Sequence, residues 1–195
     1  MNRRHFVLTT TAAAAAGTLV LAGCTMTSSS GKSGETDASK RQAIDASVDG
    51  TLSRLSSTVQ GSRELMSKAQ GILVFPDVKK AAFIVGAEYG EGALRSGGKT
   101  AGYFSVAGAS FGFQAGAQST AVIFLFMTQD SLAAFQSSAG WSAGGDVGVS
   151  IAKVGANGAI DTTSASSQVV ALVLTNVGLM ADASVNGAKV TRLTI

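Results

Sequence analysis

Two apolar segments, residues 121–127 and 168–174, constrain the fold of this chain more than any other feature. Apolar runs of about seven residues without polar alternation are typical of strands buried on both faces. The chain is also poor in charge, at 14%, and contains 24 glycines, a composition that favours a β-rich protein with close backbone approaches. We therefore expect a sheet with at least two fully buried central strands.

Further strands are predicted around this centre. A short strand at 71–75 is expected to stop at Pro76, with Lys79 and Lys80 in the turn, and an alternating strand follows at 83–90. Residues 96–99 predict a turn. Four even-numbered glycines would line one face of an extended segment, where another element can approach closely: Gly102, Gly108, Gly112 and Gly116.

Two Asn-Gly pairs predict hairpin turns, at 157–158 and 186–187, the second pairing residues 181–185 with 188–192. The alternation at 147–151 indicates another short strand. Trp141 lies in a glycine-rich stretch and is expected to fill the core or the sheet edge. In all, we expect eight to ten strands.

One apolar stripe predicts a helix within residues 40–70, since its members recur at spacings of three and four: Ile44, Val48, Leu52, Leu55 and Val59. Gly61 is expected to end or bend this helix, with a second short helix at 62–70 and a third at 129–136. The stripe is predicted to pack on its own domain, and contact with a membrane is the open alternative. The fold class predicted is α+β and β-rich: a coiled antiparallel sheet or barrel-like core with N-terminal amphipathic helices packed on it.

The start of the chain has the layout of a bacterial lipoprotein signal. Arg3 and Arg4 precede an apolar segment too short to span a membrane, and Leu21, Ala22 and Gly23 lead to Cys24, the sole cysteine. We predict a signal peptide at 1–23, lipidation of Cys24 by diacylglyceryl and a further acyl chain such as palmitate, a flexible tether at 24–40 and a domain at 41–195.

Export through the general secretion pathway and through the twin-arginine pathway both fit the two arginines. Thr25 stands where an inner-membrane retention signal would usually have Asp. The expected location is therefore the outer membrane, facing the periplasm.

The residues that the domain lacks exclude several function classes. The only histidine of the chain, His5, lies in the signal peptide, and the only cysteine, Cys24, directly follows it. A Ser-His-Asp or Cys-His nucleophile and a Cys/His zinc site are therefore excluded from the domain. Without Arg3 and Arg4, 13 basic residues face 12 acidic ones, so no nucleic-acid partner is expected. The glycine-rich segments lack the pattern of a nucleotide-binding loop, and no cofactor is expected.

Six short motifs, in this order and spacing, resemble the SYLF domain: GILVFP at 71–76, FIVG at 83–86, GEG at 90–92, GASFGFQAGA at 108–117, KVGANG at 153–158 and GLMA at 178–181. The resemblance covers about residues 60–195. It implies binding of membrane lipids, notably of phosphoinositides in eukaryotic members, through a helix at the front of the domain and basic residues. Anionic phospholipids are the candidate ligands for this chain. The corresponding candidate lipid contacts here are Ile44, Val48, Leu52, Leu55, Val59, Lys68, Lys79, Lys80 and Lys99.

The resemblance also implies actin binding for some members. This chain has no dense lysine cluster of the kind expected for filament binding, so lipid is the expected partner. The leading hypothesis is a non-catalytic envelope lipoprotein that binds lipid surfaces. The alternative is a structural or interaction lipoprotein that organises the envelope without specific lipid binding. A glycan hydrolase built on Glu88 and Glu91 is the third, disfavoured because residues three apart in a strand face opposite sides.

Overall fold

The computed structural model describes residues 36–80, 87–108, 120–143, 148–152, 160, 167–176, 178–180, 185 and 187–195. The chain divides into two units, Met1–Gly34 and Glu35–Ile195, and the three helices and nine strands described belong to the second. The predictions for the signal region, Cys24, residues 81–86, Gly112, Gly116 and the turn at 157–158 lie outside the described residues.

The centre of the sheet is formed by strands β4 (Thr120–Phe126) and β7 (Val169–Thr175), which pair antiparallel. All seven residues of β4 are buried, which confirms the prediction of a central strand. Successive side chains of a strand project to opposite faces, so each strand contributes to two hydrophobic clusters. From β4, one cluster receives Val122, Phe124 and Phe126, and the other receives Ala121, Ile123 and Leu125.

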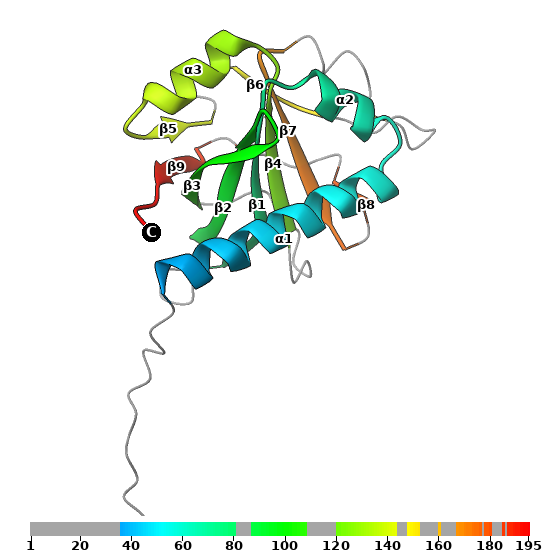
Figure 1. Cartoon of the computed structure of the whole chain (residues 1–195). Coiled ribbons are helices and arrows are strands. Elements are labelled where there is room, and N and C mark those ends of the chain that lie inside the picture. Colours follow the sequence, from blue (N-terminus) through cyan, green and yellow to red (C-terminus); the bar gives the residue numbers. More distant parts are fainter. Residues whose placement is uncertain are drawn as a thin grey trace, which may run out of the picture. The chain divides into compact units, whose positions relative to one another are not determined.

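The sheet is a curled, mixed half-barrel of nine strands (Figure 1). Its order is β5-β9-β3-β2-β1-β4-β7-β6, with β8 paired to β7. The remaining strands are β1 (Gly71–Lys80), β2 (Glu88–Ser96), β3 (Lys99–Gly108), β5 (Trp141–Ser142), β6 (Val149–Ile151), β8 (Gly178–Leu179) and β9 (Lys189–Arg192).

The three helices occur where the sequence predicts them: α1 (Asp37–Thr58), α2 (Ser62–Lys68) and α3 (Gln129–Ser137). Thr36 and Thr128 cap α1 and α3, their side chains accepting hydrogen bonds from the backbone N–H groups of Ser39 and Ser131. Gly61, with φ 83°, turns the chain between α1 and α2, as predicted. The buried Ser62 hydroxyl stabilises this turn by donating to the Leu55 and Val59 carbonyls at 3.0 and 2.6 Å.

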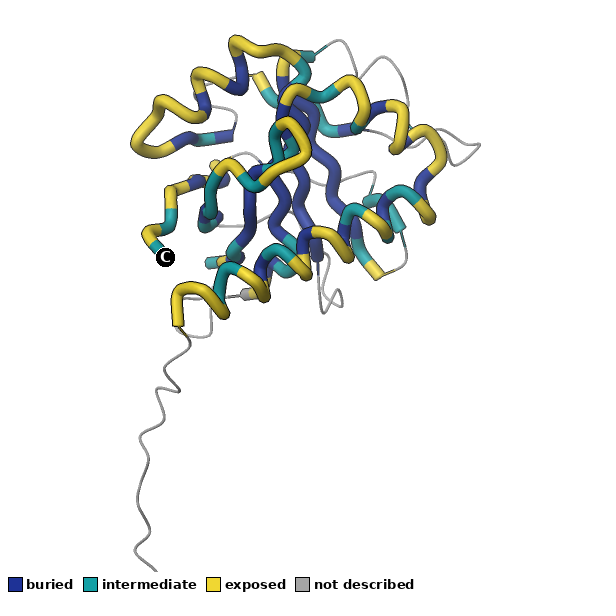
Figure 2. Tube along the Cα trace, viewed as in Figure 1, coloured by how far each residue is buried: buried dark blue, intermediate teal, exposed yellow. Residues whose placement is uncertain are grey.

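The two faces of the sheet are covered by different elements. Helix α1 lies across one face, over β1 and β2, and the residues along the middle of the sheet are buried (Figures 1 and 2). The other face packs against Leu132 and Phe135 of α3 and against Trp141 of β5. Trp141 is buried at the edge strand and meets the rings of Phe124 and Phe135 edge-on, which confirms its predicted role.

The predicted end of the first strand at Pro76 is wrong. Strand β1 continues to Lys80, because the ladder shifts register between Val74 and Asp77 and this bulge accommodates a residue without an N–H. Lys79 and Lys80 therefore lie in a strand, opposite Tyr89 and Glu88, and not in a turn.

The predicted fold class is confirmed: an α+β domain with a curled, barrel-like sheet and N-terminal helices packed on it. The pairs are antiparallel except that β6 pairs parallel to β7, which requires a crossover connection. The predicted hairpin turn includes Asn186 and its first arm includes residues 181–184, all outside the described residues; the Ala188 N–H donates to the Val185 carbonyl at 3.1 Å. The predicted pairing of 188–192 with that arm is wrong, because β9 has β3 on one edge and β5 on the other.

Two glycines of β2 lie where the β1 bulge brings the strands together. A Cβ on Gly92 would lie 1.9 Å from the Val74 carbonyl oxygen, and one on Gly90 would lie 2.9 Å from a Val78 methyl group. Neither distance is compatible with van der Waals contact. By contrast, Gly97 and Gly98 have φ of 58° and 75° and form the predicted turn between β2 and β3.

We expect Gly92→Ala to lower the free energy of unfolding by at least about 2 kcal/mol, since the new methyl group must displace backbone. Gly50→Ala in α1 is the control, since its Cβ would meet nothing within 4 Å. It should raise stability by about 0.5–1 kcal/mol. Urea denaturation followed by circular dichroism measures both. Equal stability of the Gly92→Ala and wild-type proteins would contradict the close approach.

Candidate functional site

The apolar stripe of α1 lies against the sheet. Ile44, Val48, Leu55 and Val59 are buried, with exposed fractions of 0–8%, and Leu52 is half-buried. They share a cluster with alternate residues of β4 and β7: Ala121, Ile123, Leu125, Val170, Leu172 and Leu174. The structure thus confirms that the stripe packs on its own domain. Lipid contact by these five residues stays a prediction, and it would require the helix to leave the sheet.

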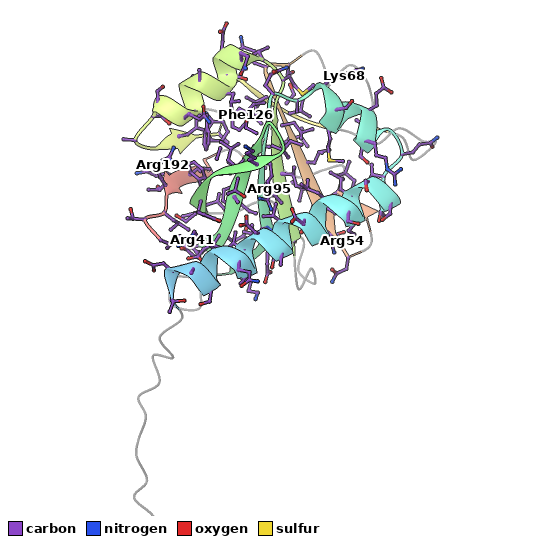
Figure 3. All side chains as sticks on the ribbon, in the orientation of Figure 1. Arg41, Arg54, Lys68, Arg95, Phe126 and Arg192 are labelled. Carbon is purple, nitrogen blue, oxygen red and sulfur yellow. The ribbon has the colours of Figure 1, made fainter. Side chains whose placement is uncertain are left out.

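A polar cluster bonds α1 to strands β2 and β3. We call Asp45, Asp49, Arg95, Thr100 and Tyr103 the Arg95 cluster. The guanidinium of Arg95 forms ion pairs with Asp45 at 3.0 Å and Asp49 at 2.7 Å and donates to the Asp45 carbonyl oxygen at 3.2 Å. Figure 3 shows Arg95 beside α1, between the labelled Arg41 and Arg54 of that helix.

Asp45 accepts further hydrogen bonds within the Arg95 cluster. The hydroxyls of Thr100 and Tyr103 each donate to its carboxylate at 2.8 Å, and Arg95 also bonds Thr100. Burial raises the pKa of Tyr103 above its ordinary value, and the hydrogen bond to Asp45 raises it further. Tyr103 is therefore protonated at neutral pH and serves as a donor to the carboxylate.

A second polar contact lies near the start of α1. Lys40 forms an ion pair with Glu91 of β2 at 2.9 Å, and the Tyr89 hydroxyl donates to the same carboxylate oxygen at 2.9 Å. Partial burial and this hydrogen bond raise the pKa of Tyr89. The phenol is thus neutral and a donor at physiological pH.

The two carboxylates considered for glycan hydrolysis are separated by the strand. Glu91 faces α1, whereas Glu88, 4% exposed, projects to the opposite face, as alternation along β2 requires. Among the described residues, no group of three or more His, Cys, Asp or Glu side chains gathers as a metal site would require. Glu88 and Glu91 therefore do not form the paired acid and base that glycoside hydrolysis requires.

The comparison with protein families identifies the C-terminal part of the chain. Residues 107–194 match the family described as "Ysc84: Las17-binding protein actin regulator". They are a Ysc84 (SYLF) family domain. The family is associated with lipid and actin binding, and its domains are generally non-catalytic binding modules. No curated protein matches the chain.

The match begins at the end of β3 and includes β4, α3 and every later strand. Helices α1 and α2 and strands β1 and β2 precede it, although they complete the same sheet and cover one of its faces. The structure of this chain shows that α1 covers one face of the sheet. The family match does not show this, because it begins at residue 107 and does not include α1.

The four predicted lysine contacts lie at two ends of the sheet. Lys79 and Lys80 pair with Tyr89 and Glu88, at one end of β2, whereas Lys99 pairs with Ser96 at the other, roughly 23 Å away. Lys68 belongs to the Ser96 end, because the Ser96 hydroxyl donates to the Gln70 carbonyl. The lysines therefore do not form one patch.

Two of these lysines have acidic partners. Lys68 pairs with Glu64 at 2.7 Å, and Lys79 pairs with Asp77 at 2.6 Å. The hydrogen bond to Asp77, followed by its charge, raises the pKa of Lys79, and the corresponding bond from Lys68 lowers the pKa of Glu64. Their use as head-group contacts stays a prediction.

Neither the Arg95 cluster nor a role for the exposed Tyr89 was predicted from the sequence. A signal for the cluster existed: Asp45 and Asp49 are one helical turn apart on α1, and Arg95 is an isolated cation near the end of a strand. Pairing them required knowledge that α1 crosses β2. Neither Cys24 nor the signal region lies in the described residues, and none of the described helices is long and apolar enough to span a bilayer.

We expect Arg95→Met to lower the free energy of unfolding by about 1–2 kcal/mol, because Asp45 and Asp49 lose their half-buried cation. Hydrogen exchange should accelerate in α1 more than in β4. Lys68→Met, which removes an exposed ion pair of α2, is the control and should change α1 exchange little. Equal exchange in α1 for Arg95→Met and wild type would show that the cluster does not fix the helix.

Proposed function

We propose that this protein is a non-catalytic lipoprotein of the bacterial envelope, anchored through Cys24, whose SYLF domain binds membrane lipid surfaces. The observation that supports lipid binding most directly is the family match at 107–194, because the family is associated with lipid and actin binding. The segment ending in Leu21, Ala22, Gly23 and Cys24 supports the anchor.

Lipid is favoured over actin by the distribution of charge. The described cations form no dense cluster: Lys79 lies at one end of the sheet, whereas Lys68 and Lys99 lie at the other. Filament binding requires a dense basic surface, whereas a lipidated protein is already held at a membrane and needs only weak additional attraction. Anionic phospholipid is the proposed ligand class, and the outer membrane facing the periplasm is the proposed location.

We expect the chain expressed in a two-membrane bacterium to incorporate labelled palmitate, because Cys24 is the only thiol available for acylation. Cys24→Ala should lose the label and accumulate as a slower-migrating precursor on gel electrophoresis. Thr25→Asp is the control: it should keep the label and move to the inner-membrane fraction. Label retained in Cys24→Ala, or absent from the wild type, would refute the anchor.

We expect the Cys24→Ala chain to float with vesicles containing phosphatidylglycerol more than with pure phosphatidylcholine vesicles. This chain retains its signal peptide, so Arg3→Ser and Arg4→Ser are added to remove the basic residues of that segment. The apolar segment 6–21 is then common to both arms, and the difference reports the charged surface of the domain. Salt at 0.5 M should reduce that difference, since it shortens the Debye length to about 4 Å. Equal flotation with both lipids, or none, would instead support an envelope protein without specific lipid binding.

A further inference from the structure

Four side chains form an exposed row across one end of the sheet. Lys79 of β1 is directly opposite Tyr89 of β2, Tyr89 is opposite Ala107 of β3, and Ala107 is opposite Lys189 of β9. Residues directly opposite in a ladder project to the same face, and adjacent strands are about 4.8 Å apart. The row, which we call the Tyr89 row, therefore places two lysines roughly 14 Å apart with a tyrosine between them.

The Tyr89 row lies on the same face of the sheet as α1, beyond the end of that helix. Ala93 of β2 is buried in the cluster beneath α1, Glu91 pairs with Lys40 of α1, and Tyr89 is the next residue of the same face. All four members of the row are exposed, and Tyr89, 43% exposed, is the only exposed large hydrophobic residue of the described chain.

The charges beside the row leave one cation in excess. Asp77 pairs with Lys79, and Glu91 pairs with Lys40. Within the described part of the chain, Lys189 has no ion-pair partner. A tyrosine flanked by lysines suits a bilayer interface, where the ring meets the apolar boundary and the lysines meet anionic head groups.

The place where the tether joins the domain favours a bilayer as the partner of the Tyr89 row. Helix α1 starts at Asp37, and the ion pair of Lys40 with Glu91 fixes its first turn beside the Tyr89 row. Only residues 25–36 separate Cys24 from this helix, a span of at most about 45 Å. Acyl chains on Cys24 would attach the domain to the membrane by the end of α1 that lies beside the Tyr89 row, whereas Lys99 of β3 lies roughly 23 Å away along the sheet.

From these observations we propose that the Tyr89 row is the surface through which the domain meets anionic bilayers, with α1 still packed on the sheet. The proposal rests on the proposed function and assigns its contact surface. It adds Tyr89, Ala107 and Lys189 to that surface, keeps Lys79, and removes Lys68 and Lys99 from it.

Two matched substitutions test the charge of the row. In the Cys24→Ala background, Lys189→Glu and Lys99→Glu change the net charge equally at exposed strand positions. We expect Lys189→Glu to weaken binding to phosphatidylglycerol vesicles about tenfold or more and Lys99→Glu to change it less than about threefold. Tyr89→Ser should also weaken binding. Thermal unfolding of each variant checks that the fold is retained.

A fluorescent label tests which end of the sheet meets the bilayer. The Cys24→Ala chain has no cysteine, so Ala107→Cys and Ala101→Cys each accept one environment-sensitive label. Both positions are exposed alanines of β3, at opposite ends of the strand. Added phosphatidylglycerol vesicles should shift the emission of the label at 107 to shorter wavelength and leave that at 101 nearly unchanged.

The outcomes separate the two proposals. If the Cys24→Ala chain itself does not prefer anionic vesicles, the proposed function fails. If it does, while Lys189→Glu binds as Lys99→Glu does and the labels respond equally, the Tyr89 row is not the contact surface. A label response only at 101 would place the membrane at the opposite end of the sheet, and retention of a protein partner by the row in place of vesicles would also overturn the proposal.

Discussion

Strand β4 has no polar face, and the arrangement of the whole domain depends on this constraint. All seven of its residues are buried, so each face of the sheet needs an apolar cover. Helix α1 supplies one cover with Val48 and Leu55, and α3 and β5 supply the other with Phe135 and Trp141. Because the strand needs a cover on both faces, α1 belongs to the core of the fold although it lies outside the matched family segment.

Sequence patterns correctly predicted the helices, strands and turns that depend on interactions between residues close in sequence. The stripe of α1, the apolar run of β4 and the glycine turn at 97–98 each depend on residues close in sequence, and each was confirmed. The errors concern pairing between distant segments. Pro76 is tolerated because β2 and β4 both adjust their register beside it, and the partners of β9 come from β3 and β5.

In the Tyr89 row, too, the sequence alone predicted only part of the surface, because the rest depends on pairing between distant strands. The sequence marked Lys79 as a possible lipid contact but not Lys189, which is 110 positions further along the chain. Only the succession of pairings from β1 through β2 and β3 to β9 places these lysines on either side of Tyr89. The Arg95 cluster depends on the same kind of information, because Asp45 and Arg95 meet only where α1 crosses the sheet.

The energetics of α1 decide between the two ways in which this domain could meet a membrane. Detaching the helix would expose Ile44, Val48, Leu55 and Val59, at about 1.5–3 kcal/mol each, which is comparable to the whole stability of a typical domain. A bilayer could again bury the helix stripe. It would not cover the sheet side chains left behind, which include Ile123, Leu125 and Leu172. Contact through the Tyr89 row leaves both clusters intact and requires only side chains that are already exposed, so it is the less costly route to the membrane.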